Sequence, residues 1–206
     1  MIDLVLKKSK ERSLLRRHPW VYDTAVQKVV LDSKKTAPAS GETVRVVSFD
    51  GRFLAWAAYS PESTIRARCW SFKEEEVIDA SWFERKLRHA VEARACLRDR
   101  TSAVRLVFGE ADGLPGLIVD QYADCLVTQF QSAGVEAHRE LIADLLMEIT
   151  GAKTIFDRSD AATRQREGLS IRSELLRGEE PPAAIEVVED GVRYAVSYTH
   201  LTLPTT

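Results

Sequence analysis

The stretch KKSKERSLLRRHPWVY, residues 7–22, contains the residue types that bind a polyanion. It places six Lys or Arg side chains and one His within twelve residues, and it ends with Trp20 and Tyr22. Such a density of cations attracts phosphates and releases their counterions, and arginine adds bidentate contacts to phosphate oxygens. The aromatic rings suit stacking on unpaired RNA bases. The segment predicts nucleic-acid binding; the alternative is a solvated charged face whose aromatic residues belong to the core.

A second set of cations lies in STIRARCWSF, residues 63–72. Apolar residues at positions 65, 67 and 69 alternate with Arg66, Arg68 and Trp70, which is the pattern of a strand with one apolar face. We expect the other face to be exposed and to extend the basic surface. The predicted RNA-binding residues are Lys10, Arg12, Arg16, Arg17, Trp20, Arg66 and Arg68.

The loop GEADGLPGLIVDQY, residues 109–122, combines acidic residues with glycines. Its spacing matches no calcium loop, and it lacks both a GK[ST] ending and GxGxxG. We interpret it as a tight connection whose glycines permit positive φ and whose Asp112 accepts from local backbone amides. A metal or phosphate site is the less favoured reading.

The segment FDRSDAATRQREG, residues 156–168, places Asp157, Arg158 and Asp160 after an apolar run. These residues suit an ion-pair network or a polar site at a strand end. Ser159 or Asp160 is positioned to cap the short helix that follows. We favour capping and pairing over a catalytic role.

The remaining reactive residue types show no grouping. Cys69, Cys96 and Cys125 form no CxxC pair and no Cys/His metal spacing, and the four histidines stand in unrelated contexts. No catalytic, cofactor-binding or metal-binding residue is predicted. Thiols without a disulfide pattern are typical of a reduced cytoplasmic protein.

The distribution of charge divides the chain in two. Of the 206 residues, the first 72 carry a net charge of about +6 and the rest about −8, and the charged run KEEE at 73–76 marks the boundary. No apolar run is long enough for a membrane span or a signal peptide. The sequence indicates a basic module joined to an acidic one. It indicates no oligomeric state.

Local patterns predict an α+β protein. Asp50-Gly51 and Asp190-Gly191 are hairpin turns between apolar runs. Ser81 and Glu84 have capping-box spacing, before a helix whose core face is Phe83, Leu87, Ala90, Val91 and Leu97. Strands are predicted at 42–49, 52–60, 104–109, 117–122, 125–132 and 153–159; a helix is predicted at 135–149, with Leu141, Leu145 and Ile149 facing the core, and a short helix before Gly168.

Several long motifs together resemble one family. SLLRRHPWVY at 13–22, the run 51–70, GEADGLPGLIVDQY, the run 155–169 and GEEPP at 178–182 are similar to the bacterial large-subunit ribosomal RNA methyltransferases. The resemblance covers essentially residues 1–196. Those enzymes transfer a methyl group from S-adenosylmethionine to carbon 5 of a cytosine in 23S rRNA.

The resemblance implies an organisation and a partner. Residues 1–72 would form a small β-barrel-like PUA domain that binds the ribosomal RNA, and 73–196 a mixed α/β central domain of the EEHD type. Residues 197–206 depart from the family, so we expect a non-native tail and a chain truncated before the methyltransferase domain. In the family that domain holds S-adenosylmethionine and the catalytic cysteine, so no cofactor is expected in this fragment.

Two other functions stay open at this stage. One is a free-standing RNA-binding module that catalyses no reaction and uses the same surface. The other is a protein-interaction fragment whose basic stretch binds acidic partners.

Overall fold

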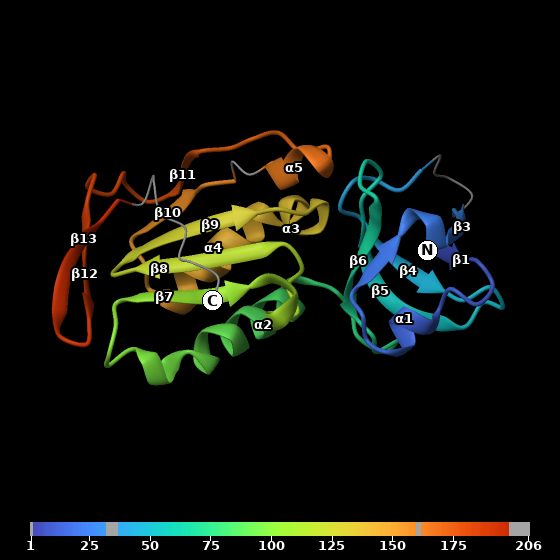
Figure 1. Cartoon of the computed structure of the whole chain (residues 1–206), viewed down its shortest axis with the longest axis horizontal. Coiled ribbons are helices and arrows are strands. Elements are labelled where there is room, and N and C mark those ends of the chain that lie inside the picture. Colours follow the sequence, from blue (N-terminus) through green and yellow to red (C-terminus); the bar gives the residue numbers. More distant parts are fainter. Residues whose placement is uncertain (1, 32–36, 160–161, 198–206) are drawn as a thin grey trace.

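The computed structural model describes residues 2–31, 37–159 and 162–197, which form two lobes (Figure 1). The described strands from Asp3 to Ser71 form the N-terminal lobe, and the described elements from Ala80 to Val196 form the C-terminal lobe. The predicted α+β class is confirmed. Of the tail predicted to be non-native, all but Ser197 lies outside the described residues.

The N-terminal lobe is built on a six-stranded sheet in the order β2-β6-β5-β4-β1-β3. The strand pairs are antiparallel except for β1 with β4. The alternating apolar residues face an interior that includes Leu4, Val46 and Ala57, and the predicted turn at Asp50-Gly51 joins β4 to β5. The elements are β1 (Asp3–Leu6), α1 (Arg12–Leu15), β2 (Trp20–Tyr22), β3 (Val26–Val30), β4 (Thr43–Val47), β5 (Phe53–Tyr59) and β6 (Ile65–Ser71), with a 3₁₀ turn at Asp23–Ala25.

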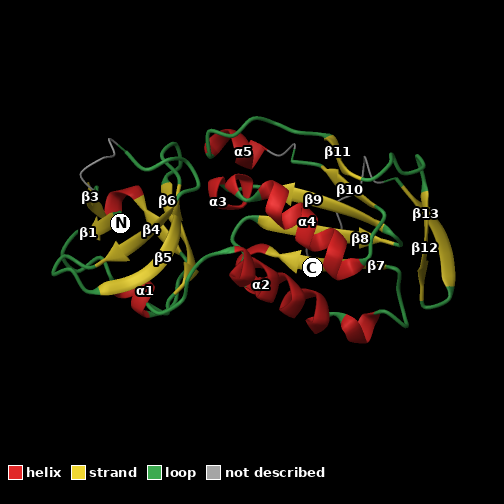
Figure 2. Cartoon of the chain, turned by 180° about the vertical axis from the view of Figure 1, so that it is seen from behind, coloured by secondary structure: helices red, strands yellow, loops and turns green. Residues whose placement is uncertain are grey.

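The C-terminal lobe has a five-stranded sheet in the order β11-β10-β9-β8-β7, and α2 and α4 cover one face of it (Figure 2). Strands β9 and β10 are parallel, because the chain crosses back through α3 and α4. The elements are α2 (Ala80–Ala93), β7 (Ala103–Phe108), β8 (Leu117–Tyr122), β9 (Cys125–Phe130), α3 (Ala133–Ala137), α4 (Arg139–Thr150), β10 (Thr154–Asp157), α5 (Ala162–Arg166), β11 (Glu174–Arg177), β12 (Ile185–Glu189) and β13 (Val192–Val196).

The start of α2 differs from the prediction. The N-cap is Asp79, whose carboxylate accepts from the Trp82 backbone N–H at 2.9 Å, so the Ser81 capping box is wrong. Asp79 stands three residues before Trp82, and a carboxylate also suits the helix N-terminus. Leu97 lies beyond the helix in a 3₁₀ turn and is exposed, whereas the other four predicted core residues are buried.

The predicted helix at 135–149 is two helices. The backbone leaves helical geometry at His138, with φ −110° and ψ 17°, so α3 ends there and α4 begins. The fully buried side chains of α4 are Ile142, Ala143 and Leu146. The predicted core residues Leu141, Leu145 and Ile149 are partly buried and pack against the same core, so the predicted face lies at the border of the buried one.

The last two strands pair with each other as a hairpin at the far end of the C-terminal lobe (Figure 1), and Glu189 of β12 also forms an isolated bridge with Thr101. Asp190 and Gly191 both have positive φ, +47° and +85°, as the Asp-Gly turn predicts. Ile185, Val187 and Val196 pack against the C-terminal sheet in a small separate core.

Candidate nucleic-acid interface

The predicted cations of the first stretch lie on the surface of the N-terminal lobe. Lys10, Arg12, Arg16 and Arg17 are exposed on α1 and the turns that flank it, while Leu14 is buried and anchors the segment. Among the described residues, none forms an ion pair with these four side chains. We name residues 7–17 the basic segment. It presents a row of cations held in place by one apolar anchor.

The basic segment ends at the junction of the lobes. The Arg17 guanidinium lies 5.1 Å from the centre of the Phe72 ring and donates to the Phe72 carbonyl at 3.4 Å. Phe72 follows β6 directly and begins the linker to α2. The last cation of the segment is therefore held where the linker to the C-terminal lobe begins.

Three aromatic side chains follow the basic segment, two of them on the edge strand β2 and one just before it. His18, Trp20 and Tyr22 contact edge to face, with ring centres 5.6 and 6.4 Å apart. Because they are two residues apart, they lie on one face. Tyr22 is 44% exposed. We name these residues the aromatic stripe, and their ring faces suit stacking on unpaired bases.

Trp20 ties the aromatic stripe to the C-terminal lobe. Its indole N–H donates to Glu110 Oε1 at 2.7 Å. Glu110 belongs to the GEADGLPG loop, for which the sequence predicted a local role only. The loop itself is as predicted: Gly109, Gly113 and Gly116 have positive φ, and the Asp112 carboxylate accepts from the Phe108 backbone N–H at 2.6 Å.

The expectation that β6 has an exposed basic face is wrong. Arg68 is only 8% exposed, and its guanidinium binds Glu167 at 2.7 Å and approaches Glu110 at 3.9 Å. Trp70 is 4% exposed and packs edge to face on Trp82. This face of the strand is covered because it forms the junction between the lobes.

Arg66 is half-buried and forms hydrogen bonds with the loop that precedes β6. Its guanidinium donates to the carbonyls of Ser60 and Pro61. Neither Arg66 nor Arg68 extends the basic segment across β6. The signal available in the sequence was Trp70, since a large aromatic side chain in a strand is typically buried.

Glu167 is the residue of the junction that sequence reasoning missed. It is 2% exposed, and its carboxylate accepts from Ser60 Oγ at 3.0 Å, Ser63 Oγ at 2.6 Å and Arg68 at 2.7 Å. All three donors belong to the N-terminal lobe. A buried carboxylate needs such partners to offset its desolvation, so Glu167 fastens the lobes together.

Gly168 allows that approach. Its φ is +71°, as predicted for a residue that ends a helix, and a Cβ there would lie 2.4 Å from Glu62 Cγ. The end of α5 therefore inserts beside the loop that carries Ser60 and Ser63. A side chain at position 168 would be strained at this φ and would force the Glu62 side chain to move.

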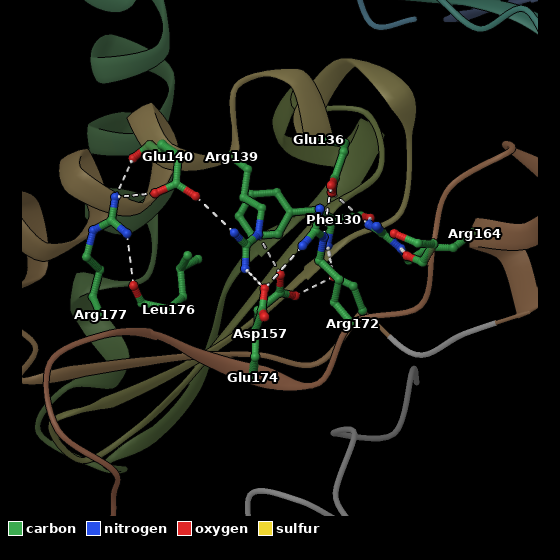
Figure 3. Close-up of polar contacts among 12 residues, drawn as sticks. Phe130, Glu136, Arg139, Glu140, Asp157, Arg164, Arg172, Glu174, Leu176 and Arg177 are labelled. Atoms are coloured by element: carbon green, nitrogen blue, oxygen red, sulfur yellow. Dashed lines mark hydrogen bonds and ion pairs between the residues drawn. The ribbon is translucent and has the colours of Figure 1, made fainter.

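The FDRSD segment forms an ion-pair network within the C-terminal lobe (Figure 3). Asp157 binds Arg139 at 2.7 Å, and Arg139 also binds Glu174 at 2.7 Å. The fully buried Arg164 binds Glu136 at 2.9 Å. Burial raises the pKa of Asp157, and hydrogen bonds from Ser159 and Arg139 oppose that rise. The pairing interpretation is confirmed for Asp157.

Ser159 has a different position from the one expected. Its hydroxyl donates to Asp157 at 2.5 Å and accepts from the Phe130 backbone N–H at 2.8 Å, so it joins β9 to β10. Asp160, the other candidate cap, lies outside the described residues.

The three cysteines are free thiols. Burial raises the pKa of Cys69 strongly and that of Cys125 to about 11, so neither forms a thiolate nucleophile near neutral pH. Within residues 2–31, 37–159 and 162–197, no group of three or more His, Cys, Asp or Glu side chains is placed to hold a metal ion. No helix in these ranges is long and apolar enough to cross a membrane.

Comparison with known proteins agrees with this geometry. Residues 4–72 match the family model of a PUA-like domain. The chain is 43% identical over 197 residues to "Ribosomal RNA large subunit methyltransferase I" of Yersinia pseudotuberculosis (serotype O:1b, strain IP 31758) and to the protein of the same name in Yersinia pestis bv. Antiqua (strain Angola). These alignments cover 95% of this chain and 48% of each relative, so the chain spans about half their length.

A solved structure shares the fold. "A putative sam-dependent methyltransferase from Streptococcus mutans" superposes with a TM-score of 0.75 at 19% identity, over 96% of this chain and 48% of that one. A second structure, titled as a putative methyltransferase complexed with SAH, matches equally well. At this identity the likeness concerns the fold alone.

Proposed function

Because this chain is related over 95% of its length to large-subunit ribosomal RNA methyltransferases, we propose that it is the RNA-recognition portion of such an enzyme. The reaction is transfer of a methyl group from S-adenosylmethionine to carbon 5 of a cytosine in large-subunit ribosomal RNA, in the cytoplasm. Residues 1–72 act as the PUA-like RNA-binding domain, and residues 73–196 as a central domain that holds it in position.

The observation that carries this proposal is the surface at residues 7–22. Its cations Lys10, Arg12, Arg16 and Arg17 are exposed and form no ion pair with the described residues, and the aromatic stripe follows them in the chain and extends onto an edge strand. Cations bind the RNA backbone, and aromatic rings stack on unpaired bases. Lys10, Arg12, Arg16 and Arg17 contact phosphate in this proposal, whereas Arg68 holds the lobes together.

We assign recognition to these residues, and none of the chemistry. The glycine loop at 109–116 has neither a GK[ST] ending nor a GxGxxG pattern, and a Cβ at Gly116 would lie 2.6 Å from the Ser132 side chain, so we assign no methyl-donor cofactor to it. The buried thiols Cys69 and Cys125 do not suit nucleophilic attack on a base. No step of methyl transfer is therefore routed through the described residues.

The test is a salt titration of RNA binding. If the basic segment contacts about four phosphates on a single strand, the logarithm of the association constant falls with the logarithm of salt concentration with a slope of roughly −3. In the double variant Arg16→Ala/Arg17→Ala we expect the slope to become shallower by about 1.4, because two phosphate contacts are lost. Fluorescence anisotropy of a labelled ribosomal RNA fragment measures both slopes.

The control is Lys153→Ala, which removes an exposed cation from the C-terminal lobe, where Lys153 pairs with Asp124. It should leave the slope unchanged. Equal slopes for the wild type and the double arginine variant would contradict the proposal, as would RNA binding that is insensitive to salt.

A further inference from the structure

A small pocket opens in the C-terminal lobe beside the aromatic stripe. Its volume is about 260 Å³, below the lower end of about 300 Å³ for sites that enclose drug-sized ligands. It connects to the stripe through Glu110, which accepts the Trp20 hydrogen bond. The pocket is lined by Phe108, Gly109, Glu110, Ala111, Gly116, Ile118 and Gln131.

One wall of the pocket is an exposed aromatic ring. Phe108 is 43% exposed at the end of β7. The Arg105 guanidinium lies 5.3 Å from the centre of that ring and is held by two hydrogen bonds to Asp120, at 2.8 and 3.0 Å. The guanidinium covers one face of the Phe108 ring. The opposite face is the one on which a flat ligand would stack.

The remaining walls combine apolar contact with neutral and acidic polar groups. Ile118 supplies apolar surface, Gln131 supplies an amide, and Glu110 supplies a carboxylate. A carboxylate repels phosphate but accepts hydrogen bonds from the amino and imino groups at the edge of a base. The lining therefore selects an uncharged planar ring with donors on its edge.

Contacts between the two lobes connect the pocket to the surface that carries the basic segment. Trp20 is bonded to the pocket residue Glu110 at 2.7 Å, and Arg17 is held against Phe72 at the junction. The buried Glu167 contact prevents the lobes from separating easily. A single strand that lies along the basic segment and the aromatic stripe is therefore led to the pocket at Glu110.

We propose that this pocket binds one unpaired nucleobase of the RNA, stacked on Phe108 with its edge facing Glu110 and Gln131. The inference rests on the proposed function, because it requires RNA on the neighbouring surface. It adds a second recognition element, in the C-terminal lobe, that reads a base rather than the backbone.

The experiment measures binding of a short RNA single strand to the chain and to its Phe108→Ala variant. The strand carries the fluorescent base aminopurine, whose emission falls when it stacks. We expect Phe108→Ala to bind about tenfold or more weakly, the scale of losing one base–aromatic stack, with an unchanged salt slope because no cation is removed. Phe108→Tyr should retain binding. The Phe108 backbone N–H bond to Asp112 is intact in both variants.

Two controls distinguish the pocket from the surface beside it. Tyr194→Ala removes an aromatic ring of similar exposure from the distal hairpin and should change nothing. A strand with abasic sites in place of its bases should bind wild type and Phe108→Ala equally. If Phe108→Ala binds the normal strand as tightly as wild type while the salt slope stays steep, the pocket does not bind a base, and the proposed function is unaffected. If the wild type shows no salt-dependent RNA binding, both are wrong.

Discussion

Two regions of the N-terminal lobe are made from the same residue types and have opposite surroundings. The surface at residues 7–22 carries exposed arginines and the partly exposed Trp20. The outer face of β6 carries Arg68 and Trp70, which are 8% and 4% exposed. Arginine beside an aromatic residue therefore does not by itself indicate a nucleic-acid surface. Whether such an arginine is exposed or buried depends on whether a carboxylate from another part of the chain pairs with it.

That carboxylate is distant in sequence. Glu167 lies about a hundred residues beyond Arg68 and reaches it at 2.7 Å only because α5 packs against the N-terminal lobe. Cations near residues 10–17 have no such partner among the described residues. The two arginine groups should consequently respond to different perturbations: the buried group to changes in stability, and the exposed group to salt and RNA.

The largest expected effect is on the buried side of this comparison. Glu167→Ala leaves Arg68 buried without its closest counter-charge, and removes the carboxylate to which the Ser60 and Ser63 hydroxyls donate. Removing one partner of a buried ion pair costs about 3–5 kcal/mol. We expect a loss of that order in the free energy of unfolding, with the two lobes unfolding in separate transitions. Differential scanning calorimetry measures both.

Glu186→Ala is the matched control, because Glu186 pairs with Arg193 on the exposed distal hairpin, with side chains 64% and 72% exposed. We expect a change within about 0.5 kcal/mol. A Glu167→Ala chain that unfolds in one transition at nearly the wild-type temperature would show that the lobes are held together elsewhere, for example by Trp70 and Trp82.

A smaller loss of stability is expected from a change to Trp20, the residue of the aromatic stripe that binds the C-terminal lobe. Trp20→Phe keeps an aromatic ring but removes the N–H that donates to Glu110 at 2.7 Å. Loss of one partly exposed hydrogen bond to a carboxylate should cost about 1 kcal/mol. Because the ring remains, RNA affinity should fall less than in Trp20→Ala. Chemical denaturation and anisotropy together test this, and an equal loss of affinity in both variants would assign the role of Trp20 to its hydrogen bond.

Local features of the fold were predictable because local chemistry determines them. The Asp-Gly turns at 50–51 and 190–191 need positive φ, and Gly168 ends a helix, so each can be read from a few residues. The basic segment was also evident, since its cations are adjacent in sequence.

The junction was not predictable in the same way. Alternation placed Arg68 and Trp70 correctly on one face of β6 but does not specify whether solvent or another lobe covers that face. Glu110 and Glu167 lie 90 and 99 residues from the side chains they bind. Only the packing of the two lobes brings them together.

The smallest expected effect is on the stability of the fold at acidic pH. Glu76 lies in the linker, and its carboxylate accepts from the Trp82 indole N–H at 3.2 Å. Its pKa is lowered from 4.5, first by a hydrogen bond from Ser71, with burial opposing and Trp82 adding to the decrease. A carboxyl whose folded pKa is lowered stabilises the fold fully above its unfolded pKa, and loses that contribution as pH falls through the folded pKa.

Glu76→Gln removes this contribution. We expect the variant to be less stable than wild type at neutral pH by no more than about 1 kcal/mol, and the two stability curves to converge as the pH falls from 4.5 through the lowered pKa of folded Glu76. Denaturant unfolding at a series of pH values measures the difference. A gap that stays constant down to the acid limit would show that the amide loses packing rather than charge. The junction of the lobes would then depend on the buried Glu167 contact, with no measurable share from ionised Glu76.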